Sequence, residues 1–193
     1  MKDAILRKTR ESAELAAKFF EQNGERLAQC AGVLASRFRE GGRLFVMGNG
    51  GSACDALHVA VEFQHPIVEK RRALPALALA ADVASLTAIG NDTDFARVFV
   101  DPLDLHARPV DAVLGISTSG ASANVNRALG RARELGCLTI GFAGRDGGRM
   151  VDLCAHCFTV QSWSIHRIQE VHTMLLHLLW DEVHLALGED DVL

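Results

Sequence analysis

The sequence lacks the features that mark several large classes of protein. Its 193 residues carry a formal net charge of −4, so there is no basic surplus for binding nucleic acid. No apolar run approaches the roughly 18 residues that a membrane span needs, and the start, MKDAILRKTRESAE, is too charged for a signal peptide. We therefore expect a cytoplasmic protein that binds neither nucleic acid nor membrane.

Cysteine is also scarce, and its number and spacing give no disulfide framework. The five cysteines are scattered, and most lie among apolar residues, which favours reduced thiols. Cys154 and Cys157 form a CxxC pair, but no second pair completes a zinc knuckle. Because the pair lies in the apolar run 153–160, we interpret its members as buried structural thiols.

The first informative segment is residues 43–62, RLFVMGNGGSACDALHVAVE. Its apolar run 44–47 suits a buried parallel strand, and 53–63 suits a helix. The turn between them consists of Asn49, Gly50, Gly51 and Ser52, with Ser52 placed to cap the helix. Its backbone N–H groups and the helix dipole favour phosphate, although the turn matches neither GxGxxG nor the Walker pattern. It is therefore either a phosphate site or a tight connection.

His58 and Glu62 are spaced i, i+4 in this predicted helix, so their side chains lie on one face. A histidine and a carboxylate beside a phosphate turn suggest chemistry on a phosphorylated small molecule. The alternative is an ordinary solvated or core-edge helix face.

From Arg43 onward, apolar strand candidates alternate with helix candidates. The strands are expected at 44–47, 76–80, 112–116, 138–142 and 157–160. The helices are expected at 53–63, 83–89, 93–105, 122–135 and 164–187. This order predicts an α/β fold, a three-layer αβα sandwich around a five-stranded parallel sheet, with ligands beyond the carboxyl ends of the strands. Residues 3–40 have helical periodicity that is interrupted at 22–24, so we expect two helices before the sheet.

The third predicted strand runs into Gly115-Ile116-Ser117-Thr118-Ser119-Gly120-Ala121-Ser122. Four hydroxyl side chains in six residues can donate to phosphate oxygens, and the N-terminus of the next helix adds its dipole. They are Ser117, Thr118, Ser119 and Ser122. No lysine is present, so this cradle suits a sugar phosphate better than a nucleoside triphosphate.

Two other polar segments are less specific. Residues 64–74 hold His65, Glu69, Lys70, Arg71 and Arg72, a basic cluster that we interpret as solvated surface. The segment Gly90-Asn91-Asp92 is either a turn whose polar side chains bind sugar hydroxyls or a cap for the helix that follows.

STSGxS after a strand resembles the signature of the SIS (sugar isomerase) domain. In order along the chain, GNGGSACDALH, AIGND, GISTSGASANV, GRDGG at 144–148 and RIQEVH resemble one branch of that family, the phosphoheptose isomerases. The resemblance covers most of the chain, from about Gly41 to His177. It implies conversion of sedoheptulose 7-phosphate, a phosphorylated seven-carbon sugar, to D-glycero-D-manno-heptose 7-phosphate for activated heptose.

The resemblance also implies the residues of the site. One Zn²⁺ per site would be held by His58, Glu62, Gln169 and His177. Substrate contacts carried over are Asn49, Gly50, Gly51, Ser52, Glu62, Asn91, Asp92, Ser117, Thr118, Ser119, Ser122 and Gln169. Isomerisation through an enediol needs a base at carbon and an acid at oxygen, which we assign to Glu62 and His177. Whether Glu62 is both ligand and base stays open at this stage.

Gln169 and His177 are eight residues apart, roughly 12 Å along a helix. Either both side chains stretch to a common point, or the site draws on more than one chain. Sites in the family lie between subunits of a tetramer, so the resemblance implies a homotetramer. We expect residues 1–193 to form a single SIS domain, with 1–40 packing on the core and on partner subunits.

Two departures concern the rim of the substrate site. Many relatives have arginine where this chain has Pro66, and some have an acid where it has His166. These changes leave the identity of the sugar open. The alternatives to an isomerase are a non-catalytic adaptor, resembling the initiator-associating protein that binds DnaA, and a phosphosugar sensor. Neither needs the four metal-ligand residues that this chain carries.

Overall fold

The computed structural model describes residues 1–67 and 71–191. Within them, five parallel strands form one sheet in the order β2-β1-β3-β4-β5. The strands are β1 (Leu44–Gly48), β2 (Ala76–Ala78), β3 (Ala112–Ser117), β4 (Leu138–Gly144) and β5 (His156–Val160). The helices are α1 (Lys2–Arg39), α2 (Gly51–Gln64), α3 (Val83–Asp92), α4 (Val100–His106), α5 (Ala123–Glu134), α6 (Met150–Leu153) and α7 (Ile165–Ala186), with a 3-10 turn η1 (Phe95–Arg97).

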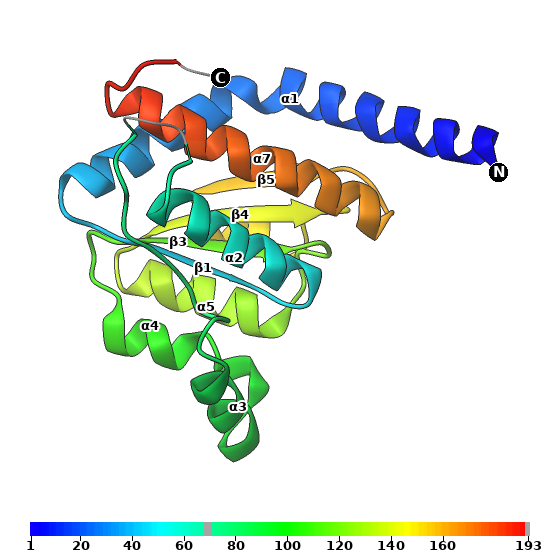
Figure 1. The fold of residues 1–193 in the computed structure, drawn as a ribbon. Coiled ribbons are helices and arrows are strands. Elements are labelled where there is room, and N and C mark those ends of the chain that lie inside the picture. Colours follow the sequence, from blue (N-terminus) through cyan, green and yellow to red (C-terminus); the bar gives the residue numbers. More distant parts are fainter. Residues whose placement is uncertain (68–70, 192–193) are drawn as a thin grey trace.

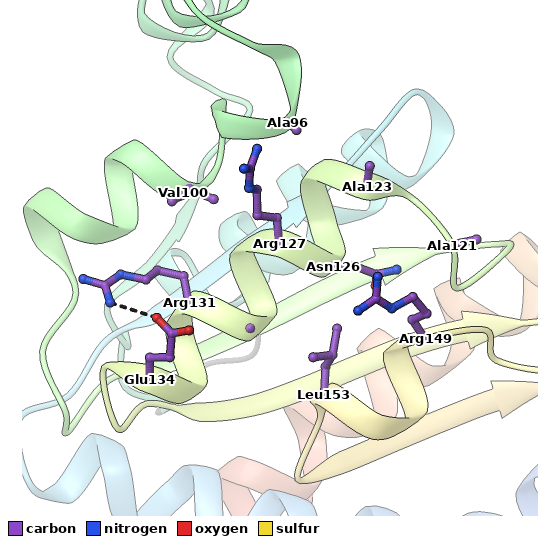
Figure 2. Close-up of a pocket in the computed structure, with 11 residues that line it drawn as sticks. Ala96, Val100, Ala121, Ala123, Asn126, Arg127, Arg131, Glu134, Arg149 and Leu153 are labelled. Atoms are coloured by element: carbon purple, nitrogen blue, oxygen red, sulfur yellow. Dashed lines mark hydrogen bonds and ion pairs between the residues drawn. The ribbon is translucent and has the colours of Figure 1, made fainter.

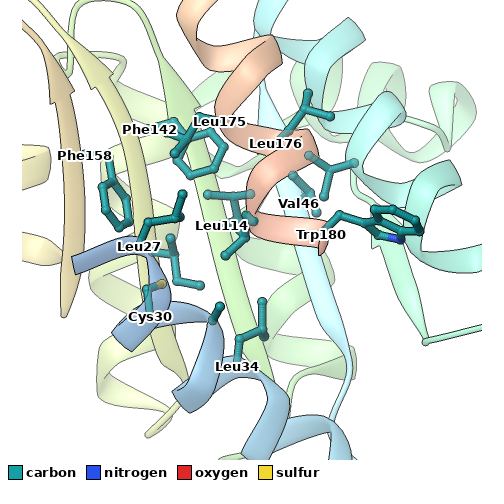
Figure 3. Close-up of a cluster of buried hydrophobic side chains, with 14 of the residues drawn as sticks. Leu27, Cys30, Leu34, Val46, Leu114, Phe142, Phe158, Leu175, Leu176 and Trp180 are labelled. Atoms are coloured by element: carbon teal, nitrogen blue, oxygen red, sulfur yellow. The ribbon is translucent and has the colours of Figure 1, made fainter. Parts of the chain in front are cut away.

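Helices cover both faces of the sheet, which confirms the predicted three-layer α/β fold (Figure 1). Alternate residues of β1 point to opposite faces, as the period of a strand requires. Leu44 and Val46 join the core beneath α1, α2 and α7, whereas Phe45 and Met47 join the core beneath α4 and α5. Figure 3 shows the first core, where Leu27 and Leu34 of α1 meet Phe142, Phe158 and Trp180.

The prediction of two N-terminal helices is wrong, because α1 is one helix of 38 residues. Residues 22–24 do not end it. The Asn23 side chain donates to the Phe19 carbonyl one turn back, at 2.9 Å, and so does not compete for the local backbone. Arg26 donates to the Cys157 carbonyl of β5 at 2.9 Å, and α1 packs along α7. These tertiary contacts outweigh the weak helix propensity of Gly24.

The predicted helix 93–105 is divided into η1 and α4. Asp94 starts η1 by accepting from the Ala96 N–H at 3.0 Å. Pro102 has no N–H to donate to the residue four positions earlier, so it is tolerated only in the first turn of α4. Residues 90–92, interpreted as a turn or a cap, instead form the last turn of α3. Strand β2 is two residues shorter than predicted, and the short helix α6 was not predicted.

The interpretation of residues 64–74 as solvated surface is wrong for Arg71. Its Nη2 lies 2.5 Å from Asp181 Oδ1, its guanidinium lies 4.5 Å from the centre of the Trp180 ring, and the residue is buried. Arg72 is exposed, as expected, while Glu69 and Lys70 lie outside the described residues. The five cysteines are free thiols, of which Cys157 is buried, Cys154 is half-buried and Cys54 is exposed. In the described part of the chain, no helix combines the length and apolar character of a membrane span.

Candidate active site

The first polar turn, residues 49–52, lies at the carboxyl end of β1, where the chain passes from Gly48 into α2. Gly50, with φ of 55°, is the N-cap residue, a backbone conformation that favours glycine. The prediction that Ser52 caps the helix is wrong, since Ser52 is buried in the first turn and makes no side-chain cap bond. The Gln169 side chain lies against Gly51, and a Cβ atom there would collide with its amide. A residue larger than glycine would therefore displace Gln169.

The serine-rich segment lies at the end of β3, next to β1 in the sheet. Ser117 is 3% exposed, and its Oγ lies 2.9 Å from Ser122 Oγ and 3.4 Å from Ser119 Oγ. Ser122 occupies the N-cap position of α5 without bonding to the backbone, so its hydroxyl is directed to Ser117. Three hydroxyls thus gather at the positive end of a helix, which is the donor arrangement that phosphate requires.

Asn124, which was not among the predicted site residues, joins the two turns. Its side-chain amide exchanges two hydrogen bonds of 2.8 Å with the amide of Asn49, and it is 3% exposed. The exchange fixes both amides and holds the start of α5 against the first turn. The position of Asn124 just after the serine segment was the signal in the sequence that could have indicated this role. A buried asparagine there needs partners for its amide, and the polar turn at 49–52 could supply them.

Three of the proposed metal ligands converge between α2 and α7. His58 Nε2 lies 3.2 Å from Glu62 Oε1 and 3.2 Å from His177 Nε2. One ligand atom from each of the three residues lies within 4.8 Å of the others. The spacing of His58 and Glu62 by four residues puts both on one face of α2, as the sequence predicted, and α7 brings His177 to that face.

Two of the three separations between these ligand atoms match those around a small divalent ion. Ligands about 2.0–2.1 Å from a tetrahedral zinc ion lie roughly 3.3 Å apart, close to both 3.2 Å separations. Two imidazoles and a carboxylate are also the donor types of catalytic zinc sites that keep a fourth position open. The residues present therefore fit the group that the family resemblance implies.

Other predicted site residues lie apart from this cluster. Gln169 meets the start of α2 at Gly51, whereas His58 is seven residues, or about 10 Å, further along that helix. Asn91 and Asp92 are exposed at the end of α3, which packs on η1 away from the sheet (Figure 1). Pro66 and His166, the two departures, are half-buried and exposed respectively. One chain thus brings together the cradle and three metal-ligand residues, but not Asn91 and Asp92.

Two titratable groups near the site have shifted pKa values. Partial burial raises the pKa of the Asp55 carboxyl to about 6, while the positive charge of His58 opposes that shift. Burial lowers the pKa of His172 to about 4, although its hydrogen bond to the Ala143 carbonyl works in the opposite direction. Neither residue stands in a motif that predicted a role for it from the sequence. His172 is a neutral imidazole that ties α7 to β4.

The comparisons with known proteins agree with this fold and site. A family model described as SIS domain matches residues 9–144. The chain belongs to the SIS domain family, whose name denotes sugar isomerases.

Within that family, the chain belongs with the phosphoheptose isomerases. It is 41% identical to the enzyme of Aquifex aeolicus over 174 residues, which is 90% of this chain and 91% of that one. It is 48% identical to the enzyme of Pelobacter propionicus over 161 residues, covering 83% and 85% of the two chains. The structure of the Neisseria gonorrhoeae phosphoheptose isomerase matches with a TM-score of 0.88 and 34% identity, over 94% of this chain and 97% of that one. These relationships are to enzymes, and the non-catalytic alternative is not favoured.

Proposed function

We propose that the protein converts sedoheptulose 7-phosphate to D-glycero-D-manno-heptose 7-phosphate. The observation that carries the proposal is the convergence of His58, Glu62 and His177 on helices that also border the phosphate cradle. The relatives named phosphoheptose isomerase support the choice of substrate. The phosphate would bind at Ser117, Ser119 and Ser122, and the reacting carbons would lie at the three ligand side chains.

We propose that the reaction is a proton transfer between C1 and C2. Glu62 would remove the C1 proton of the ketose and return it to C2 of the enediol, while His177 moves a proton between the two oxygens. Glu62 Oε1 faces His58, and Oε2 has no hydrogen-bond partner in the described part of the chain. One carboxylate can therefore hold an ion through one oxygen and accept a proton with the other. A zinc ion held by His58, Glu62 and Nε2 of His177 would polarise the substrate carbonyl, and the proton transfer by His177 would then use its other ring nitrogen, Nδ1.

We further propose that Gln169, Asn91 and Asp92 act in an assembled homotetramer, and that residues 1–193 form one SIS domain. The first half of α1 extends beyond the body of the protomer (Figure 1), where Ile5 and Leu6 are 60% and 43% exposed. Exposed apolar residues on such an arm suit packing against partner subunits. Sedimentation of the wild type and of Ile5→Asp tests this assembly. A wild-type monomer would exclude it.

The isomerase proposal is tested by NMR assay of sedoheptulose 7-phosphate, paired with zinc analysis. Glu62→Gln should lower kcat at least 100-fold, because it removes the base, and should reduce bound zinc. Glu182→Gln is the matched control, since it removes a carboxylate from α7 outside the cluster. Equal turnover by wild type and Glu62→Gln would refute the assigned role. No turnover by zinc-loaded wild type would refute the proposed substrate.

A further inference from the structure

A cavity lies on the face of the sheet opposite α2 and α7. It has a volume of about 620 Å³ and is lined by residues of η1, α4, α5 and α6. Ala121 and Ala123, on either side of Ser122, line it where it approaches the serine segment. Figure 2 shows two of the lining arginines: Arg127 is directed from α5 toward Ala96 of η1, and Arg149 is directed toward Asn126. Its volume is within the range of small-molecule sites, roughly 300–1,000 Å³.

The charge of the lining is positive. Arg131 is neutralised by Asp104 at 2.5 Å and by Glu134 at 2.9 Å. In the part of the chain that the structure describes, Arg127 has only an exposed pairing with Asp94 at 3.3 Å, which screening by water makes weak. Arg149 has no hydrogen-bond or ion-pair partner among residues 1–67 and 71–191. Two guanidinium groups are thus available to an anion.

Asn126 adds a buried hydrogen-bond acceptor without a partner. The residue is 8% exposed and lines the cavity. Its Nδ2 donates to the Gly120 carbonyl at 3.0 Å, whereas its Oδ1 has no partner in the described part of the chain. Buried amide oxygens normally accept a hydrogen bond, so this one fits a ligand hydroxyl.

Gly130 keeps the middle of the cavity wall open. It lies in the interior of α5, where glycine is a poor helix former. A Cβ atom there would meet only Leu153 Cδ2, at 3.9 Å, so packing does not require glycine. A longer side chain at this position would project toward Leu153 and fill the cavity.

We propose that this cavity is a second ligand site, which takes a phosphorylated polyol. The phosphate accepts charge-assisted hydrogen bonds from Arg149, a hydroxyl donates to Asn126 Oδ1, and Arg127 adds positive charge on the side of η1. The site is separate from the cluster of His58, Glu62 and His177, and its existence does not depend on the proposed isomerase function. Asn126 connects it to the serine segment through Gly120.

The test is calorimetric titration of the full-length protein with glycerol 3-phosphate, a small phosphate ester with two hydroxyls. Two classes of site are expected, one in the cradle and one in the cavity. Arg149→Gln should weaken the cavity class roughly tenfold to a hundredfold, the value of a charged hydrogen bond, and Gly130→Glu should remove it. Ser119→Ala should weaken only the cradle class. Arg133→Gln is the matched control, since Arg133 is exposed on α5 and does not line the cavity.

A single class of site, or two classes that Arg149→Gln and Gly130→Glu leave unchanged, would overturn the proposal. An equal loss in Arg133→Gln would show a general effect of charge and would also overturn it. Sedimentation of the same variants measures their oligomeric state. It identifies a third outcome, in which Gly130→Glu changes that state. The cavity would then be a subunit interface rather than a ligand site. Circular dichroism verifies folding, and Arg149→Gln alters an exposed side chain that folding does not need.

Discussion

The buried imidazole of His172 should make the stability of the protein depend on pH. Its side chain is 0% exposed, its Nε2 lies 3.0 Å from the Ala143 carbonyl, and burial lowers its pKa from 6.5 to about 4. In the unfolded chain the same histidine titrates near its ordinary value. Between these two pKa values the unfolded state binds a proton that the folded state does not. The contribution to stability is therefore complete above about pH 6.5 and is lost as the pH falls toward 4.

The size of this contribution to the free energy of unfolding follows from the pKa shift of His172. A difference of about 2.5 pKa units corresponds to roughly 3 kcal/mol over the whole range, and to about 2 kcal/mol between pH 7.5 and pH 5.0. Urea unfolding of the wild type and His172→Gln, at one protein concentration and at both pH values, measures it. Glutamine keeps a donor for the Ala143 carbonyl but does not titrate.

The pKa values of His156 and His184 are also lowered, so these histidines add to the pH dependence of the wild type. Both are present in His172→Gln as well, and the difference between the two proteins therefore isolates His172. The wild type should lose about 2 kcal/mol more than His172→Gln between pH 7.5 and pH 5.0. An equal loss in both proteins would show that His172 titrates alike in the folded and unfolded states, and the reasoning from burial would fail.

Three further predictions concern α1, Arg71 and Asn124. Gly24→Ala should raise the free energy of unfolding by about 1 kcal/mol, because a Cβ there meets nothing within 4 Å; a lower melting temperature would contradict a continuous α1. Arg71→Leu should cost about 3–5 kcal/mol by leaving Asp181 unpaired, whereas Arg72→Ala, which removes an exposed pair, should cost less than about 1 kcal/mol. Asn124→Ala should raise KM for sedoheptulose 7-phosphate about tenfold, the value of one or two hydrogen bonds, and the Asn49→Ala, Asn124→Ala double variant should lose little more. Additive losses would show that the two amides act independently.

The sequence was sufficient to predict the sheet because the signals were local. Apolar runs such as 44–47 and 112–116 are short, bounded by glycine or polar residues, and separated by helical patterns. The resulting alternation determines a parallel sheet and places the polar turns at one edge. The strands lie where these patterns put them, apart from the shorter β2.

The errors arose where tertiary contacts or single residues overrode local propensity. Gly24 predicts a break in an isolated helix, but contacts of Arg26 with β5 and of α1 with α7 maintain the helix. Arg71 appears solvated beside other charged residues, and only Asp181 and Trp180, over a hundred positions later, explain its burial. Asn124 depends in the same way on Asn49, 75 positions earlier. No pattern within one segment contains these partners.

The arrangement of α2 and α7 suggests how the proposed site selects the length of its substrate. Gln169 lies at Gly51 and His177 lies at His58, so the two helices run in the same direction side by side. The interval from the turn at Gly51 to the ligand cluster is therefore about 10 Å along α2 and about 12 Å along α7. An extended seven-carbon sugar phosphate can span this interval, but a five-carbon one cannot. Ribulose 5-phosphate should bind through its phosphate yet leave its carbonyl short of Glu62, so kcat should fall at least 100-fold while KM changes little. Similar kcat values for the two sugars would show that the helices do not fix the distance between phosphate and base.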